Sequence, residues 1–200
     1  MKRATVFLML LVVVKLACSE IVVTEIMYDV SGSESGREWI ELYNSANTEK
    51  DITGWKLNES NKLHTLSSSS YILSSKSYAI ITYNKAKFLI DYPYFKGNIF
   101  ETSGYMQLSN GGEKIIIENS QRQIMDSVEY ADLADEDHSI ELKCWNLNNS
   151  YMEHWAMSTE KGTPGYGSID CENDGIPEFN TFGISMVILG IVVAVKKRLS

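Results

Sequence analysis

The chain has 200 residues, of which 44% are hydrophobic and 22% charged, so it can bury one sizeable core and form one domain. Between residues 20 and 180 it carries 12 basic and 26 acidic residues, a net charge of −14. Such an acidic surface repels phosphate backbones, and no basic stripe with interleaved aromatic residues is visible, so we expect no nucleic-acid partner.

The first predicted element is a secretory signal peptide over residues 1–19. A basic pair precedes an apolar run over residues 6–14, and small residues before Glu20 favour cleavage at that point. Two alternatives stay open: a lipoprotein signal acylated at Cys18, and a short membrane anchor. We therefore expect the body of the protein to be secreted.

Residues 20–168 are predicted to form one all-β domain. Short segments rich in Val, Ile, Tyr, Phe and Trp recur roughly every ten residues between clusters of Gly, Asn, Asp and Ser, which is typical of a β-sandwich. The clearest hairpin signal is Asn110 and Gly111, which tolerate the positive φ of a tight turn between two apolar segments. The predicted strands are 21–28, 38–43, 55–58, 77–83, 105–109, 114–118, 123–130 and 139–143.

One short helix is predicted, over residues 84–92. Asn84 can cap its N-terminus, and apolar residues follow at helical spacing. Further along, Pro164 and Gly165 are expected to close the domain, since proline ends a strand ladder and glycine permits the exit turn.

The C-terminal region is predicted to hold an acidic stalk, a transmembrane helix and a basic tail. Residues 169–180 are polar and acidic without a strand pattern, and residues 181–195 are an uncharged apolar run of nearly spanning length. The basic tail, residues 196–200, should stay in the cytoplasm. The domain is then expected on the extracellular face of the cell membrane.

The sequence REWIELYN, residues 37–44, raises the question of a catalytic acid pair. Side chains alternate between the faces of a strand, so Glu38 and Glu41 should point in opposite directions. Glycosidase carboxyl groups instead face each other across about 5 to 10 Å. A pairing of Glu41 with Glu25 on a neighbouring strand stays open, but a buried strand carboxylate is more often structural. We therefore predict no catalytic residue.

Two cysteines and two asparagines are candidate modification sites. Cys144 and Cys171 remain after the signal is removed, and in an oxidising exterior they more often pair than stay free. The predicted disulfide would stabilise the protein by about 3 kcal/mol, and two buried thiols are the alternative. Asn58 and Asn148 each begin an Asn-X-Ser glycosylation pattern.

The predicted stalk contains one metal-like spacing. Asp170, Glu172 and Asp174, followed by Gly175, alternate as oxygen ligands do in calcium loops. A weak calcium site is one interpretation of these residues, and a solvated acidic stalk is the other. We predict no other cofactor.

The order of IVVTEIMYD, REWIELYN, DITGWKL, YAIIT, LSNGGEKIIIEN, IMDSVEY and GTPG resembles the lamin tail domain, an immunoglobulin-like β-sandwich. The resemblance covers about residues 20–168. Residues 83–104 look like a family-variable insertion, where binding specificity most often resides. The resemblance also implies a fold signature, rather than an active site, at Glu38, Trp39, Glu41, Leu42 and Asn44.

The C-terminal sequence resembles the archaeal PEF-type sorting signal, a Pro-Glu-Phe motif followed by an apolar helix and a basic tail. Pro177, Glu178 and Phe179 match the motif, and Asn180 stands where a second proline often occurs. This resemblance implies recognition by an archaeosortase, which replaces the helix by a lipid. A plain transmembrane anchor is the alternative.

These observations predict a non-enzymatic, immunoglobulin-like module at the cell surface that binds an extracellular protein or glycan or serves as an envelope scaffold. The alternative is a secreted hydrolase that uses acidic residues or a calcium site in the variable loops. Convergence of certain acids in one open pocket would favour the hydrolase: Glu25, Glu41, Asp126, Glu129 and Asp132.

Overall fold

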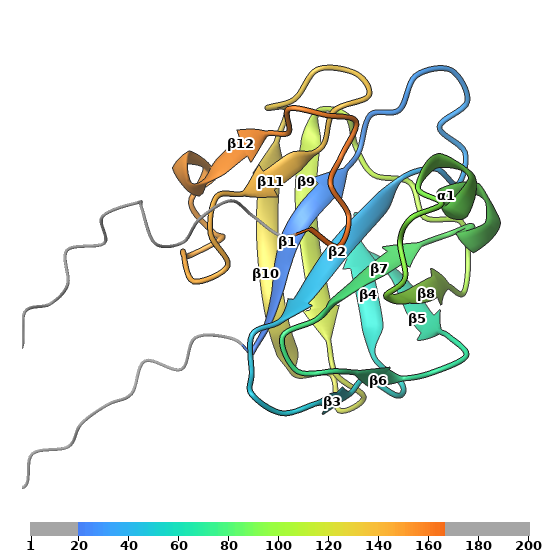
Figure 1. The fold of residues 1–200 in the computed structure, drawn as a ribbon, viewed down its shortest axis with the longest axis vertical. Coiled ribbons are helices and arrows are strands. Elements are labelled where there is room, and N and C mark those ends of the chain that lie inside the picture. The colour runs from blue at the N-terminus through green and yellow to red at the C-terminus, as the bar shows by residue number, and fades with distance from the viewer. Residues whose placement is uncertain (1–19, 167–200) are drawn as a thin grey trace, which may run out of the picture. The chain divides into compact units, whose positions relative to one another are not determined.

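The structure is a computed structural model that describes residues 20–166 (Figure 1). Most of its elements are strands, and α1 is the single α-helix among the described residues. In chain order the elements are β1 (Ile21–Met27), β2 (Trp39–Asn44), β3 (Lys50–Asp51), β4 (Lys56–Glu59), β5 (Lys62–Ser67), β6 (Ile72–Leu73), β7 (Tyr78–Thr82), α1 (Lys85–Asp91), β8 (Asn98–Thr102), β9 (Gly112–Glu118), β10 (Ile124–Ala131), β11 (Ile140–Leu142), the 3-10 helix η1 (Met152–His154) and β12 (Trp155–Met157).

Ten of the described strands form a sandwich whose two layers belong to one continuous sheet, and β3 and β6 pair in a separate two-stranded sheet. The strand order is β10-β9-β4-β5-β8-β7-β2-β1-β11-β12, and β7 and β8 are its one parallel pair among the described strands. The main core contains Val23 and Ile40 from one half of this order and Ile115 and Val128 from the other. The two halves therefore pack face to face, and the predicted all-β sandwich with one short helix is confirmed.

Strand β2 is buried on both faces. Ile40 and Leu42 enter the main core, whereas Trp39 enters a second core beside α1. The Trp39 ring lies edge-to-face against Phe88 and Tyr92, with ring centroids 5.8 and 5.4 Å away. This aromatic group attaches the helix to the outer face of the sheet, and the predicted alternation along REWIELYN is confirmed.

Helix α1 begins as its sequence predicts. The backbone of Asn84 is extended, and its side chain accepts a hydrogen bond from the N–H of Lys87 at 3.1 Å. Phe88 is the buried residue of the helix and joins it to the second core. A seven-residue helix gains little from propensity alone, so the cap and this contact determine whether it forms.

We expect Asn84→Ala to lower the free energy of unfolding by about 1 kcal/mol, because the first turn loses its side-chain acceptor. Asn84→Asp keeps an acceptor oxygen and is the matched control. Urea denaturation of both variants measures the difference. Equal stability of the alanine and aspartate variants would contradict the capping role.

The predicted hairpin is wrong in its first strand. Residues 105–109 form no strand, and the N–H of Leu108 donates to the Glu38 carboxylate at 3.0 Å instead. The carbonyl of Ser109 accepts from the Tyr130 hydroxyl at 2.8 Å. Side chains thus occupy backbone groups that a strand ladder would use, and β9 pairs with β10 and β4.

Five strands lack a predictive pattern in the sequence: β3, β5, β6, β8 and β12. Strands β3 and β6 have two residues each. In β5 the burial of two adjacent residues is opposite to hydropathy, since Leu63 is exposed and His64 is buried. Strand β8 lies within the segment expected to be an insertion, where it pairs in parallel with β7 after the α1 crossover.

Several predicted segments lie outside the described residues. These are the signal peptide, the stalk, the C-terminal apolar run and the basic tail, so each of them stays a prediction. Within residues 20–166, no helix has the length and apolar character needed to cross a membrane.

Candidate functional site

The two glutamates of REWIELYN are both buried, and only one contact satisfies Glu38. One of its carboxylate oxygens accepts a hydrogen bond from the N–H of Leu108 at 3.0 Å, and the other has no hydrogen-bond partner within the described part of the chain. Burial raises the pKa of Glu38 to about 8, the Leu108 bond opposes this shift, and nearby Glu34 adds to it. Glu38 is therefore mostly protonated at neutral pH.

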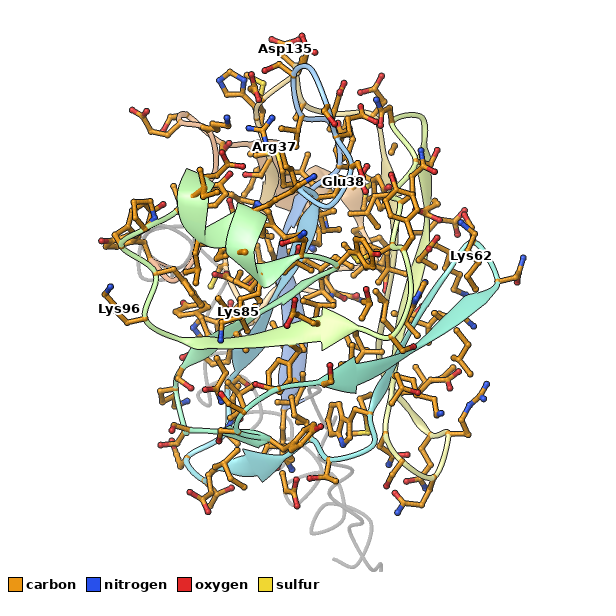
Figure 2. The ribbon with its side chains drawn as sticks, turned by 90° about the vertical axis from the view of Figure 1, so that its right-hand side faces the viewer. Arg37, Glu38, Lys62, Lys85, Lys96 and Asp135 are labelled. Atoms are coloured by element: carbon orange, nitrogen blue, oxygen red, sulfur yellow. The ribbon has the colours of Figure 1, made fainter. Side chains whose placement is uncertain are left out.

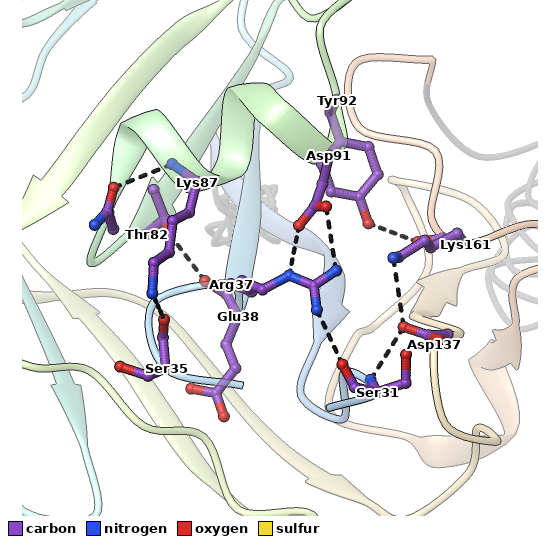
Figure 3. A network of polar contacts seen from close by, with 11 residues as sticks. Ser31, Ser35, Arg37, Glu38, Thr82, Lys87, Asp91, Tyr92, Asp137 and Lys161 are labelled. Atoms are coloured by element: carbon purple, nitrogen blue, oxygen red, sulfur yellow. Dashed lines mark hydrogen bonds and ion pairs between the residues drawn. The ribbon is translucent and has the colours of Figure 1, made fainter. Parts of the chain in front are cut away.

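Arg37 does not pair with either glutamate. Its guanidinium binds Asp91 of α1 through two hydrogen bonds of 2.8 and 3.1 Å and donates to the carbonyl of Ser31 at 3.0 Å. Figure 3 shows the Glu38 carboxylate turned away from this group. Arg37 therefore ties the loop before β2 to the helix.

The pairing of Glu41 with Glu25 that the sequence left open does occur. Glu25 on β1 is the register partner of Glu41 on β2 and of Glu141 on β11. We call these three residues the acid cluster. Burial raises the pKa of all three, that of Glu41 to about 8, and the neighbouring Glu41 adds to the shift at Glu25.

Residues 162–165, which we call the closing segment, cover the acid cluster. The N–H of Thr163 donates to Glu25 at 2.7 Å, and the N–H of Gly165 donates to Glu41 at 2.6 Å. The Thr163 hydroxyl also lies 3.0 Å from a carboxylate oxygen of Glu141. Figure 1 shows this last described segment, in orange, passing over β1 and β2. The cluster therefore holds a chain segment in place, and Glu25 and Glu41 are 2% and 1% exposed.

The other acids of the hydrolase hypothesis lie apart from the acid cluster. Asp126 accepts from the N–H of Val23 at 2.6 Å and from the Asn149 amide at 2.7 Å. Asp132 lies 3.2 Å from the Tyr28 hydroxyl, and Glu129 is exposed on β10. Two of the five acids thus converge, in a covered site rather than in an open pocket.

Gly162 allows the closing segment to approach the second core. Its φ is +110°, and an added Cβ would lie 2.9 Å from the Trp39 ring. We expect Gly162→Ala to cost roughly 1 to 3 kcal/mol through overpacking. Gly32→Ala is the control, because Gly32 has a φ of +78° with nothing within 4 Å of an added Cβ. Equal losses in thermal denaturation would show that the contact with Trp39 is harmless.

A hollow of the described surface lies beside the closing segment, and we call it the tyrosine groove. It has a volume of about 440 Å³. Three separate parts of the chain contribute to it: the start of β7, the loop between α1 and β8, and the end of the closing segment. Its lining is Lys76, Ser77, Tyr78, Tyr94, Phe95, Lys96, Gly97, Pro164, Gly165 and Tyr166.

Two tyrosines separate this groove from a second hollow of about 360 Å³. Tyr94 and Tyr166 line both, and their ring centroids lie 5.5 Å apart. Their side chains are well exposed, at 42% and 72%. Aromatic rings of this size are usually covered in a folded protein, so this exposed pair is suited to contact a ligand.

A row of aromatic rings continues from the groove. Tyr78 stacks on Tyr43 with centroids 4.6 Å apart, and Tyr43 lies 5.8 Å from Trp145. The Lys76 ammonium lies 5.1 Å from the centre of the Trp145 ring. Burial raises the pKa of Tyr78 and of Tyr94, so both phenols stay neutral and can donate hydrogen bonds.

The acid cluster therefore positions one wall of the tyrosine groove. Gly165, which donates to Glu41, lines the groove between Pro164 and Tyr166. Since the side chains of Glu25 and Glu41 are covered, their contribution to a ligand site is indirect. They hold the closing segment so that Tyr166, the next residue, lies against Tyr94.

Comparison with known families identifies the fold. The model of the Lamin Tail Domain matches residues 15–132. The chain belongs to the lamin tail domain family. No curated protein matches the chain. The match includes the groove residues of β7 and of the α1–β8 loop, and it ends before the closing segment.

In this lamin tail domain the signature residues Trp39, Glu41, Leu42 and Asn44 make contacts within the fold. Trp39 and Leu42 enter the two cores, and Glu41 binds the closing segment. The Asn44 amide donates to the carbonyls of Thr48, Leu73 and Ser74 at 2.9, 3.1 and 2.9 Å. That one side chain joins the end of β2 to the loops around β3 and β6.

The predicted modification and metal sites are placed only in part. Asn58 lies half-buried in β4 between β5 and β9, whereas Asn148 is exposed in a loop. Cys144 is buried. Within the described part of the chain, no three His, Cys, Asp or Glu side chains are grouped to hold a metal ion. The remaining predicted residues lie outside the described ones: Cys171, Asp170, Glu172, Asp174, Pro177, Glu178 and Phe179.

Sequence reasoning missed Glu141 and most of the groove. The segment DYPYFKG, within the expected insertion, supplies Tyr94, Phe95 and Lys96, so the insertion does contribute to the candidate site. Tyr166 had a weaker signal, an aromatic residue within the glycine-rich sequence PGYG. Lys76 had none.

Proposed function

We propose that this lamin tail domain is a non-catalytic binding module that uses the tyrosine groove to bind a protein segment or a glycan. The observation that carries the proposal is the exposed pair Tyr94 and Tyr166 beside a hollow of about 440 Å³. Ligand pockets typically measure about 300 to 1,000 Å³. A standard protein interface instead needs about 800 Å² from each partner, so the groove suits a small ligand or a short segment of a larger one.

The environment of the buried carboxylates supports a role in binding rather than in hydrolysis. Glu25 and Glu41 each accept two hydrogen bonds or more from the domain, and the closing segment covers them. A general acid or base must instead reach the substrate. These acids act by positioning the groove wall.

We propose that the module acts on the extracellular face of the cell membrane. The support is sequence alone: the signal-peptide pattern of residues 1–19, the apolar run of residues 181–195 and the basic tail. The acidic stalk would separate the domain from the membrane.

Processing at Pro177, Glu178 and Phe179 belongs to the same proposal. A sorted protein lacks Ile184 to Ser200 yet stays in the membrane fraction through a lipid, and replacing the three motif residues by alanine leaves the chain uncut. Mass spectrometry of membrane-extracted protein distinguishes the outcomes. A C-terminal peptide ending at Ser200 would show a plain single-span anchor.

The binding proposal is tested by screening the purified full-length protein against glycans and cell-surface proteins. The double variant Tyr94→Ala, Tyr166→Ala should lose about tenfold or more of the affinity for any true ligand, since buried aromatic anchors dominate such contacts. Tyr151→Ala is the matched control, because Tyr151 is exposed but does not line the groove. Binding that survives the double variant would place the ligand site elsewhere.

A further inference from the structure

The tyrosine groove differs in charge from the rest of the domain. Its lining contains Lys76 and Lys96 and no carboxylate, whereas residues 20–180 carry 12 basic and 26 acidic residues. Figure 2 shows Lys96 projecting at one side of the domain, and Lys62 lies at the other side. A cationic groove on an acidic protein attracts an anionic ligand, because no carboxylate in the groove lining repels it.

Backbone carbonyl oxygens hold both ammonium groups at the margin of the groove, and the Lys76 ammonium also lies over the Trp145 ring. Lys76 donates to the carbonyl of Ser45, and Lys96 donates to that of Pro93 at 3.2 Å. None of the ion pairs among the described residues involves either lysine. Because an ammonium has three N–H donors, each lysine keeps donors for a ligand.

The groove does not suit recognition of a peptide as an added strand. That mode needs a free strand edge with unpaired backbone groups. Strand β7, the strand that begins at the groove, is paired with β2 on one side and β8 on the other. The exposed rings of Tyr94 and Tyr166 instead offer flat apolar surfaces, on which the C–H face of a sugar ring can pack, flanked by phenol donors.

We propose that the ligand is an acidic saccharide, a short chain of uronic-acid units whose carboxylates bind Lys76 and Lys96 while its rings pack on Tyr94 and Tyr166. This inference rests on the proposed function of the groove. The competing occupant is an acidic peptide, and the segment that follows Tyr166 carries four acids in this very chain: Asp170, Glu172, Asp174 and Glu178.

The test is calorimetric titration of the purified full-length protein with three probes. These are trigalacturonic acid, its fully methyl-esterified form, which has the same rings without charge, and a synthetic peptide with the sequence of residues 168–178 and serine in place of cysteine. We expect the acid to bind about tenfold more tightly than the ester, because two exposed ion pairs contribute modestly each. The difference should shrink in high salt.

Variants assign the charge preference to the groove. The double variant Lys76→Gln, Lys96→Gln should bind the acid only as tightly as it binds the ester. The control Lys114→Gln on β9 should leave both affinities unchanged, because Lys114 is exposed and does not line the groove. Unchanged melting curves show that the variants fold.

Each other outcome overturns a distinct statement. If the acid and the ester bind with equal affinity, and both lose affinity in the Tyr94→Ala, Tyr166→Ala variant, the groove is still a glycan site. The proposed preference for an acidic saccharide is then refuted. Tighter binding of the peptide than of either saccharide would refute the saccharide as the occupant. The proposed function would be refuted as well if none of the three probes binds and if the ligands found in the binding screen bind the Tyr94→Ala, Tyr166→Ala variant as tightly as the parent protein.

Discussion

Trp39→Ala should lower the free energy of unfolding by about 3 to 5 kcal/mol, the cost of removing a large aromatic side chain from a packed core. Trp39 has no exposed surface, and its ring contacts those of Phe88 and Tyr92. Gly162 of the closing segment also packs against it. The substitution therefore loosens the helix and the wall of the groove together.

Chemical denaturation measures this loss, and Trp145→Ala is the matched control. Trp145 is partly exposed beside Tyr43 and Lys76, so its removal leaves no enclosed cavity. We expect the control to cost less than half as much. Similar losses in the two variants would contradict the central position of Trp39 in the fold.

Stability should fall as the pH rises from about 5 to about 8. Burial raises the pKa of Glu38 and of Glu41 to about 8, from ordinary values near 4.5. The folded state then holds protons that the unfolded chain has released, so the stability present below pH 4.5 is lost as the pH rises through the folded pKa values. One pKa unit corresponds to about 1.4 kcal/mol per group, and the total loss should reach a few kcal/mol.

Glu38→Gln should remove part of this slope and stabilise the protein at pH 8. The amide keeps an oxygen for the N–H of Leu108, and it carries no charge whose burial costs free energy at pH 8. It also removes a charge near Glu34 and Glu113. The control is Glu129→Gln, because Glu129 is an exposed residue of β10. A flat stability profile in the parent, or lower stability of Glu38→Gln at pH 8, would contradict this explanation.

Local signals predicted much of the fold. The Asn84 cap located α1, the alternation in REWIELYN assigned the two faces of β2, and the family motifs gave the sandwich. Strands β5 and β8 escaped because pairing partners, rather than hydropathy, hold them in the sheet. Similarly, the contact of Leu108 with Glu38 that replaces a strand ladder has no local signature.

The candidate site was far less predictable, because it depends on register and on contacts between distant segments. Glu25, Glu41 and Glu141 meet only through the alignment of three strands, which one sequence does not specify. Tyr94 and Tyr166 stand far apart in the chain and meet because the closing segment crosses the sheet. The sequence indicated the variable segment that carries Tyr94, but not its partner.

We propose above that the domain binds its ligand in the tyrosine groove. The most direct measurement is an NMR titration of isotope-labelled full-length protein with the tightest ligand from the binding screen. We expect backbone signals to change first at residues 76–78, 94–97 and 164–166. Changes centred instead on the separate hollow lined by Glu34 and Asn110, with those three segments silent, would contradict it.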